Sequence, residues 1–255
     1  MVIVTTSHNP SKYQVDRASA LAKDLKIPYV NRKELKSADL EQFEYYYVVE
    51  KGRITVKFKN TTLFFHPSTA KVRMRNIKNG FKDYLIEALK LNGKELILDT
   101  TFGLGSEAIL MAAFLSEGKV IGIEASTPIY VVVSHGLKEY RAKEEWVNNA
   151  MRKIEVYNDN FRSFIFRQES ESFDIVYCDP MFENPVYKSS SMNPLRPFAL
   201  YETLNEEDID QMLRVARKKV VLKAHGKDTL FDRIKPDIVM GSRKSGVLYG
   251  VIFKR

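Results

Sequence analysis

The amino-acid sequence predicts an α/β fold, with a doubly wound, mostly parallel sheet in the C-terminal part of the chain and a smaller α+β domain before it. From residue 95 onward, apolar β-like runs alternate with amphipathic helical segments, which is the rhythm of a parallel sheet covered by helices. Before residue 78, β-rich segments instead follow one another across short turns. We therefore expect a small domain at residues 1–78 and a larger one at 79–255.

The small domain begins with a predicted strand at Val2–Val4 and a helix within 10–25, where the apolar residues have helical spacing. From residue 45, three β-rich segments separated by turn residues predict a meander. Its strands are expected at 45–49, 54–59 and 63–65. Pro67 ends this pattern, and 80–91 has the apolar spacing of an amphipathic helix.

The larger domain repeats a strand-then-helix order. Strands are expected at 95–99, 119–123, 154–157, 173–178 and 220–224, and helices at 106–116, 128–140 and 206–216. The last two β-like segments, 238–241 and 247–253, are joined by a short turn that contains glycine. We expect these two to be antiparallel neighbours.

Composition limits the classes of protein that the chain can belong to. The formal charge of +8 and the pI of about 9.3 favour a polyanionic partner. Cys178 is the single cysteine, so an intrachain disulfide and a zinc site of several thiolates are excluded, and no metal is expected. No run approaches the ~20 apolar residues that cross a bilayer. We expect a soluble cytoplasmic protein without a membrane partner.

A glycine-bearing turn follows the first strand of the larger domain. The strand ends at Asp99, and the turn carries Thr101, Gly103 and Gly105 before a helix opens. Ligands of open α/β sheets bind at the carboxyl ends of strands, where glycines let backbone approach closely. A carboxylate at Asp99 can hold the ammonium group of a methionine moiety, whereas it would repel a pyrophosphate. The turn alone leaves NAD open, but these four residues are expected to bind S-adenosylmethionine.

Acidic and amide side chains also follow the next two strands. Glu124 and Ala125 come about 20 residues after the glycines, where a carboxylate accepts hydrogen bonds from ribose hydroxyls of either cofactor. Asp159 or Asn160 could bond the adenine amino group, and Phe161 could pack on the ring. A solvated strand end and an ordinary turn are the alternatives at these positions.

The fourth strand leads into Asp179, Pro180, Met181 and Phe182. Methyl transfer to an exocyclic base amine requires the amine to be aligned and its lone pair freed by hydrogen bonds to a carboxylate and a carbonyl. A base drawn out of its stack also needs an aromatic partner. Asp179, the Pro180 carbonyl and Phe182 could supply these functions. The long segment that follows, to Tyr201, is expected to be mobile without RNA and to form part of a substrate lid.

These motifs resemble the RsmJ (YhiQ-like) family of class I methyltransferases, whose bacterial members methylate a guanine exocyclic amine in small-subunit ribosomal RNA. The resemblance rests on 99–108, Glu124, 179–182 and the basic strand 218–223, and it covers about residues 80–225. It implies a Rossmann-like sheet with one antiparallel strand near its end, which also distinguishes methyltransferases from dinucleotide dehydrogenases. It places cofactor contacts at Ser106, Glu107, Glu124, Ala125, Asp159, Asn160 and Asp179.

Two departures from the family pattern affect the target nucleotide rather than the cofactor. The family has Arg-Asp where this chain has Ser106-Glu107. The proline that directly follows the phenylalanine in the family is displaced here to Pro185.

A stretch of one charge sign precedes the larger domain. Residues 51–82 contain nine Lys or Arg and no Asp or Glu, as phosphate-backbone binding requires. RNA contacts are expected at Lys71, Arg73, Arg75 and Lys78, of which the first three would share one face if the segment were extended. A solvated hairpin is the alternative.

The sequence thus predicts an S-adenosylmethionine-dependent methyltransferase acting on a nucleobase amine, with small-subunit ribosomal RNA or the 30S particle as partner. A methyltransferase for a small molecule or a protein side chain remains an alternative, as does a catalytically silent RNA-binding module. An NAD oxidoreductase is the weakest alternative, because no hydride-transfer pair stands out.

Overall fold

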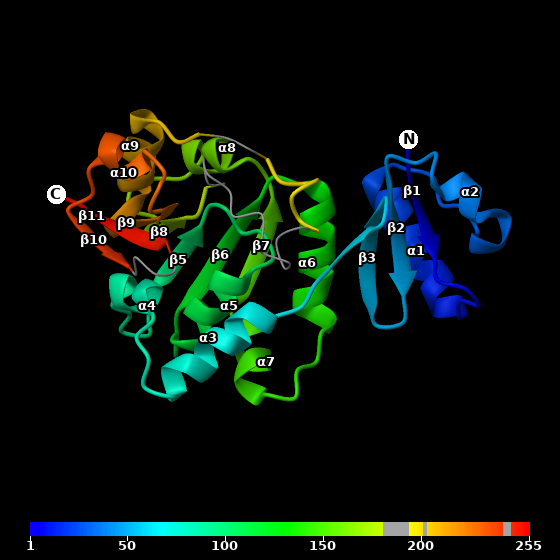
Figure 1. The fold of residues 1–255 in the computed structure, drawn as a ribbon, viewed down its shortest axis with the longest axis horizontal. Coiled ribbons are helices and arrows are strands. Elements are labelled where there is room, and N and C mark those ends of the chain that lie inside the picture. Colours follow the sequence, from blue (N-terminus) through cyan, green and yellow to red (C-terminus); the bar gives the residue numbers. More distant parts are fainter. Residues whose placement is uncertain (181–193, 201–202, 242–245) are drawn as a thin grey trace.

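The computed structural model describes residues 1–180, 194–200, 203–241 and 246–255. Within these ranges the chain forms a four-stranded sheet near the N-terminus and a seven-stranded sheet in the remainder (Figure 1). None of the helices in these ranges is long and apolar enough to cross a membrane. The two-sheet α/β architecture confirms the predicted fold class.

The four-stranded sheet has the order β1 (Val2–Thr6), β2 (Tyr45–Glu50), β3 (Arg53–Phe58), β4 (Thr61–Phe64). β2, β3 and β4 form the predicted antiparallel meander, and β1 adds to its edge in parallel with β2. Helix α1 (Lys12–Leu25) packs on β1 and β2. It begins at a capping box in which Ser11 and Gln14 bond each other's backbone, so the local sequence fixes its start. A 3-10 turn (Arg32–Glu34) and the short α2 (Ser37–Leu40) complete this part.

Residues 68–78 form a helix, α3 (Ser68–Lys78), so the extended segment considered from the alternation of its cations is not present. Its buried residues Ala70 and Met74 are four apart, which is the spacing of a helix face, and α3 packs against α5. The helical period turns Arg73 toward the interior, whereas Arg75 and Lys78 remain exposed.

The seven-stranded sheet has the order β10, β11, β9, β8, β5, β6, β7. The strands are β5 (Leu96–Asp99), β6 (Lys119–Glu124), β7 (Ile154–Asn158), β8 (Phe173–Cys178), β9 (Ala216–His225), β10 (Ile238–Gly241) and β11 (Val247–Phe253). β5 to β9 are parallel to one another, and β11 runs antiparallel to both β9 and β10. The single reversed strand near the end of the chain is therefore confirmed.

Helices cover both faces of this sheet (Figure 1). One face carries α4 (Tyr84–Leu89), α5 (Ser106–Ala113), α6 (Thr127–Glu139) and α7 (Glu145–Met151), and the other carries α8 (Phe161–Phe166), α9 (Glu206–Val215) and α10 (Leu230–Ile234). Successive strand residues serve opposite faces: Ile97 belongs to the first core and Leu98 to the second. This explains why the parallel strands read as continuous apolar runs.

Phe102 explains two of the glycines around the turn after β5. A Cβ added at Gly122 would lie 2.0 Å from the Phe102 ring, and one added at Gly105 would lie 2.7 Å from it. The ring is buried, and its backbone N–H donates to the Ile123 carbonyl at 3.0 Å. The turn is thus locked onto β6 by packing as well as by a hydrogen bond.

The small sheet packs against α6, the helix that follows β6 (Figure 1). A Cβ at Gly136 of α6 would lie 2.2 Å from the ring of Phe65, so glycine here lets the two parts approach closely. Arg17 of α1 forms an ion pair with Glu139 of α6 at 2.6 Å. The apolar residues of the small sheet and of the α6 face belong to one continuous core.

Candidate active site

A cavity of about 110 Å³ lies at the carboxyl ends of β5, β6 and β8. The sequence-predicted residues that line it are Thr101, Gly103, Glu124, Ala125, Asn160, Asp179 and Pro180. These come from turns after four different strands, so the parallel sheet has brought together residues up to 79 positions apart in the sequence.

Five other predicted residues lie around this cavity rather than on its wall. Asp99 is 1% exposed beneath the turn, and Gly105 and Ser106 begin α5. Glu107 points into a group of charged side chains described below. Asp159 forms an ion pair with Arg167, and its carboxylate also accepts from the Asn160 N–H.

Glu124 is the best-defined polar group on the cofactor side of the cavity. One carboxylate oxygen accepts the Gly103 N–H at 2.8 Å and the other accepts the Ser126 N–H at 2.8 Å. Each oxygen keeps acceptor capacity for a further donor. Burial raises the pKa of Glu124, against the lowering effect of these two backbone bonds. The carboxylate is therefore oriented before any ligand arrives.

Thr101 joins the glycine turn to the residues after β8. Its hydroxyl accepts the backbone N–H of Asp179 at 2.6 Å, and its own N–H donates to the carboxylate of Asp99 at 3.1 Å. Thr100 adds a second tie, because its N–H and its hydroxyl both donate to the Tyr177 carbonyl. The tips of β5 and β8 are thus held in register at the site.

Asp179 belongs to a chain of partly buried ionic contacts. Its carboxylate lies 2.6 Å from the Lys223 ammonium of β9, which lies 3.2 Å from Glu107 of α5. Glu107 is in turn 3.1 Å from Arg73 of α3, and Arg73 also pairs with Asp83 at 2.8 Å. Side chains from α3, α5, β9, the turn after β8 and the N-cap of α4 therefore converge on one set of charges next to the cavity.

The pKa shifts in this group follow from burial and from the two cations. Burial raises the pKa of Asp179, and the adjacent Lys223 opposes this shift. Burial alone would raise the pKa of Glu107, but Lys223 and Arg73 lower it to about 2. The carboxylates more than offset the burial of Lys223, so its pKa is raised and it stays an ammonium. Burial raises the pKa of Asp99 well above its ordinary value, which favours the protonated form unless a cation lies beside it.

The segment 194–200 covers the cavity opposite the strand tips. Leu195, Ala199 and Leu200 line it, together with Leu204. Phe198, in the same segment, packs edge-on against Tyr45 and Phe58 of the small sheet, with ring centroids 5.3 and 5.8 Å away. The small sheet thus supports the cover of the cavity. The predicted Met181 and Phe182, and most of the predicted lid segment, lie outside the described residues.

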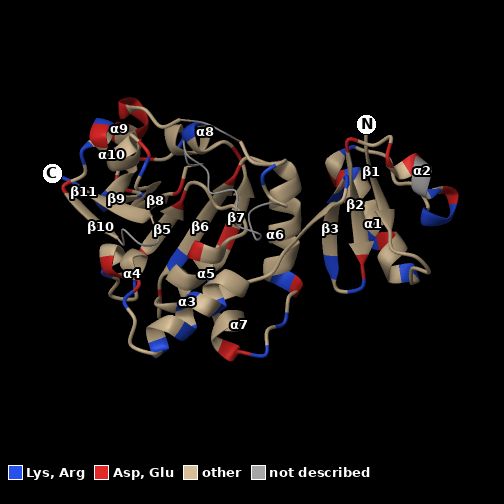
Figure 2. Cartoon of the chain, viewed as in Figure 1, with Lys and Arg blue, Asp and Glu red and all other residues tan. Residues whose placement is uncertain are grey.

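The predicted RNA contacts on α3 differ in their surroundings. Lys71 pairs with Glu144 at 2.7 Å, and Arg73 belongs to the buried charge group. Arg75 and Lys78 are exposed. Figure 2 shows Lys and Arg along α3 and along the segment between α6 and α7. The basic surface therefore extends beyond the stretch that the sequence singled out.

The side chains around the cavity fit S-adenosylmethionine. Each oxygen of Glu124 keeps acceptor capacity that a ribose hydroxyl could use, and the Asp99 carboxylate, buried just beneath the cavity wall, has the charge that would suit an ammonium group. Ile123, Ile129 and Phe161 supply apolar walls for a flat ring. The buried hydroxyl of Tyr177, within electrostatic range of Asp99 and Asp179, has no hydrogen-bond partner among the described residues. In the same part of the chain, no three His, Cys, Asp or Glu side chains are grouped to hold a metal ion.

Sequence reasoning missed the roles of Lys223 and Arg73 in the charge group. A signal for Lys223 was present, because a lysine at the end of the apolar run 220–222 alternates onto a buried face. No local pattern announced Arg73, since its partners Asp83 and Glu107 are 10 and 34 residues away. The leucines of the cover were also missed, because they belong to no motif.

Comparison with known proteins gives consistent results. A family model described as "Putative SAM-dependent methyltransferase" matches residues 30–247. "Uncharacterized protein YpiP" of Bacillus subtilis is 37% identical over 259 residues, covering 98% of this chain and 98% of that protein. "Ribosomal RNA small subunit methyltransferase J" of Coxiella burnetii is 26% identical over 91% of each chain. The protein of the same name from Aliivibrio fischeri is 26% identical over 70% of this chain and 73% of its own length.

Among solved structures, a SAM-dependent methyltransferase from Neisseria gonorrhoeae covers 100% of this chain and 96% of its own, with a TM-score of 0.68 and 15% identity. At this level of identity the likeness shows the fold. It extends over the small N-terminal sheet as well as the large one.

Proposed function

Because the chain belongs to the family described as "Putative SAM-dependent methyltransferase", we propose that it methylates an exocyclic nucleobase amine, guanine N2 in small-subunit ribosomal RNA. S-adenosylmethionine is the cofactor of this family. Proteins named ribosomal RNA small subunit methyltransferase J are among the distant relatives of this chain. The name of those relatives indicates a ribosomal RNA substrate, and the residues of the site support proposing the same substrate for this chain.

One observation carries the proposal: Asp179 and Pro180 line the same cavity as Glu124 and Gly103. A carboxylate and a proline carbonyl after β8 are the acceptors that an amine N–H pair requires. They lie beside the groups suited to a ribose. A nucleoside cofactor and an amine can therefore meet in this cavity.

Each residue then has a defined task. Bound S-adenosylmethionine supplies a methyl group already activated by its sulfonium. Glu124 binds the ribose hydroxyls, and Asp99 binds the ammonium of the methionine moiety. Asp179 and the Pro180 carbonyl would accept hydrogen bonds from the two N–H groups of the amine and direct its lone pair toward the methyl group. Phe182, which lies outside the described residues, is the proposed stacking partner of the base. Lys223 fixes the Asp179 carboxylate, to which it is bonded at 2.6 Å.

The basic N-terminal part is proposed to bind the RNA. We propose that residues 1–78 present the RNA and that 79–255 transfer the methyl group. Arg75 and Lys78 are exposed on α3, and Lys71 is held beside them by Glu144, so they are suited to phosphates. Arg73 is assigned instead to the charge group around Asp179.

The test is to incubate the protein with S-adenosylmethionine carrying a labelled methyl group and total RNA from a strain that lacks it. We expect label in small-subunit ribosomal RNA, at a guanine N2 once the modified base is mapped. Asp179→Ala should abolish transfer while RNA affinity stays within a few-fold. Label confined to small molecules or to protein would contradict the RNA assignment, and no transfer by the wild type to any RNA would favour a binding module.

A further inference from the structure

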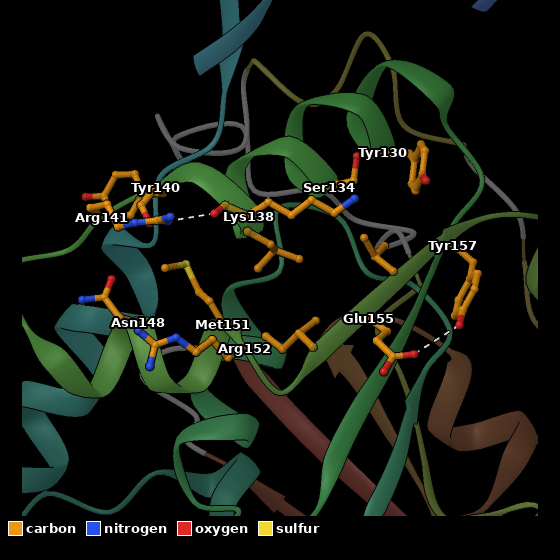
Figure 3. A pocket seen from close by; sticks show the side chains of 13 residues that line it. Tyr130, Ser134, Lys138, Tyr140, Arg141, Asn148, Met151, Arg152, Glu155 and Tyr157 are labelled. Atoms are coloured by element: carbon orange, nitrogen blue, oxygen red, sulfur yellow. Dashed lines mark hydrogen bonds between the residues drawn. The ribbon is translucent and has the colours of Figure 1, made fainter. Parts of the chain in front are cut away.

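A second hollow, distinct from the cofactor cavity, runs along the outer edge of the large sheet. It has a volume of about 490 Å³ and lies between α6, α7 and β7 (Figure 3). Tyr130 and Lys138 of α6, Arg152 and Tyr157 are among its lining residues. β7 ends the order of strands and pairs with β6 alone among the described strands. We call this hollow the edge groove.

The edge groove is positively charged. Lys138, Arg141 and Arg152 line it, against the single carboxylate of Glu155. Glu155 is already bonded, because it accepts from Lys119 at 3.1 Å and from the Tyr157 hydroxyl at 3.2 Å. Its hydrogen bond with Lys119 lowers the pKa of Glu155, so it stays ionised and engaged. The charge left to a ligand is that of the three cations, and all three are exposed.

Aromatic side chains line the same groove, with Tyr140 beside Arg141 at one end and Tyr130 and Tyr157 at the other (Figure 3). Tyr157 is 46% exposed and stacks on Phe164, with ring centroids 6.1 Å apart and an interplanar angle of 30°. Tyr130 and Tyr140, both half-buried, also line the groove. Proteins hold single-stranded nucleic acid by combining cations that contact its phosphates with aromatic rings on which its bases stack.

The edge groove lies beside the cofactor cavity. On α6, Ile129 lines the cavity and the next residue, Tyr130, lines the groove. At β7, Tyr157 near the end of the strand lines the groove, and Asn160 just after the strand lines the cavity. At the other end, Tyr140 packs edge-on against His66, with centroids 5.6 Å apart, where the chain passes from the small sheet to α3. The groove thus lies between the start of α3 and the cofactor end of the cavity, where Ile129 and Asn160 line the cavity together with Glu124.

We propose that the edge groove binds a single-stranded RNA segment flanking the target base, with Lys138 and Arg152 on phosphates and Tyr157 stacked on a base. The inference deepens the proposed function and rests on it. The charge of the groove favours RNA over an extended peptide added to the open edge of β7, since that mode depends on backbone pairing and needs no cations.

Fluorescence anisotropy with a labelled single-stranded RNA of mixed sequence, titrated at several salt concentrations, tests the proposal. Lys138→Gln with Arg152→Gln should weaken binding and reduce the slope of log affinity against log salt by about 1.4, from about 0.7 per phosphate contact. Lys94→Gln with Lys235→Gln, which removes the same charge from exposed positions before β5 and before β10, is the matched control and should leave both values unchanged.

Tyr157 separates stacking from charge. Tyr157→Ala should weaken RNA binding about 5- to 150-fold with no change in the salt slope, whereas Tyr157→Phe, which keeps the ring, should bind as the wild type does. In methyl-transfer assays the groove variants should raise KM for RNA and leave kcat unaltered.

The outcomes distinguish this inference from the proposed function. If the wild type methylates RNA while the groove variants keep its affinity and salt slope, the groove proposal is wrong and the proposed function stands. If the wild type neither binds nor methylates RNA, both are wrong. An effect of the Lys94 and Lys235 control as large as that of the groove pair would also overturn the groove proposal, because the loss would then reflect net charge alone.

Discussion

The two ends of the active-site cavity are held together by different contacts. At the cofactor end, Glu124 bonds backbone N–H groups 21 and 2 residues away, and Asp99 bonds one 2 residues away. At the acceptor end, Asp179 is held by Lys223, 44 residues on, and Lys223 contacts Glu107 across 116 residues. The first end is set by local turns. The second depends on the packing of the whole domain.

This difference implies different sensitivities. Damage at the cofactor end removes a ligand contact and an acceptor of local backbone N–H groups. Damage at the acceptor end leaves a charge buried without its partner, which costs far more free energy. Arg73 extends the second effect to α3, so the basic N-terminal helix is coupled to Asp179 through Glu107 and Lys223.

The largest effect is expected from Lys223→Met, which leaves Asp179 without its cation. The free energy of unfolding should fall by about 3–5 kcal/mol, as for other broken buried ion pairs. Urea denaturation measures it. Lys219→Met is the matched control on the same strand. The Lys219 side chain is buried too, but its ammonium donates to the Ala88 carbonyl, and among the described residues it forms no ion pair. Equal losses in the two variants would refute the special role of the acceptor-end pair.

Asp179→Asn should lower kcat for methyl transfer by about 10²- to 10³-fold, the usual loss when one oriented group is removed from a reacting centre. Single-turnover transfer to RNA measures it. Asp174→Asn, at the opposite end of the same strand, changes a carboxylate that accepts the Leu96 N–H far from the cavity and should leave kcat unaltered. A normal kcat in Asp179→Asn would remove this residue from the mechanism.

The same comparison explains how much could be predicted from the sequence. The alternation of strands and helices along the chain, the reversed strand near its end and the carboxylates at the ends of β5, β6 and β8 follow from local periodicity and turn chemistry, and the sequence predicts them; the order of the strands in the sheet was not predicted. Arg73 was assigned to RNA because the sequence shows its neighbours on the chain but not Glu107 in space. The helix at α3 was not predicted, and the alternation of its cations was considered only for an extended segment, whereas Ala70 and Met74 are buried at a helical spacing where α3 packs on α5.

A third prediction concerns the cofactor end. Glu124→Gln should weaken binding of S-adenosylmethionine about 10- to 150-fold, the value of hydrogen bonds to a charged group, with little change in the free energy of unfolding. Burial raises the pKa of Glu124, so cofactor affinity of the wild type should fall on acidification already above the ordinary glutamate range. Calorimetry across pH should show this acid limb in the wild type and a smaller one in the variant, where Asp99, whose pKa burial also raises, still titrates.

The last prediction concerns the pH dependence of stability at Lys219, which interacts electrostatically with Lys90, Glu95 and Lys218. Burial lowers its pKa from 10.5 to about 8, so between these values the unfolded chain binds more protons at this position than the folded chain. Its contribution to the free energy of unfolding therefore rises with pH across this window and is constant below it. The difference between wild type and Lys219→Met should show this rise, and a flat difference would show that Lys219 is solvated.

Calorimetric titration of S-adenosylhomocysteine into the wild type, Glu124→Gln and Asp179→Asn tests the central claim most directly, namely that the cofactor and acceptor ends share one cavity but have separate tasks. We expect one site in the wild type, a clear loss of affinity in Glu124→Gln and a much smaller loss in Asp179→Asn. A folded wild type that takes up no S-adenosylhomocysteine, or two variants weakened alike, would contradict the account.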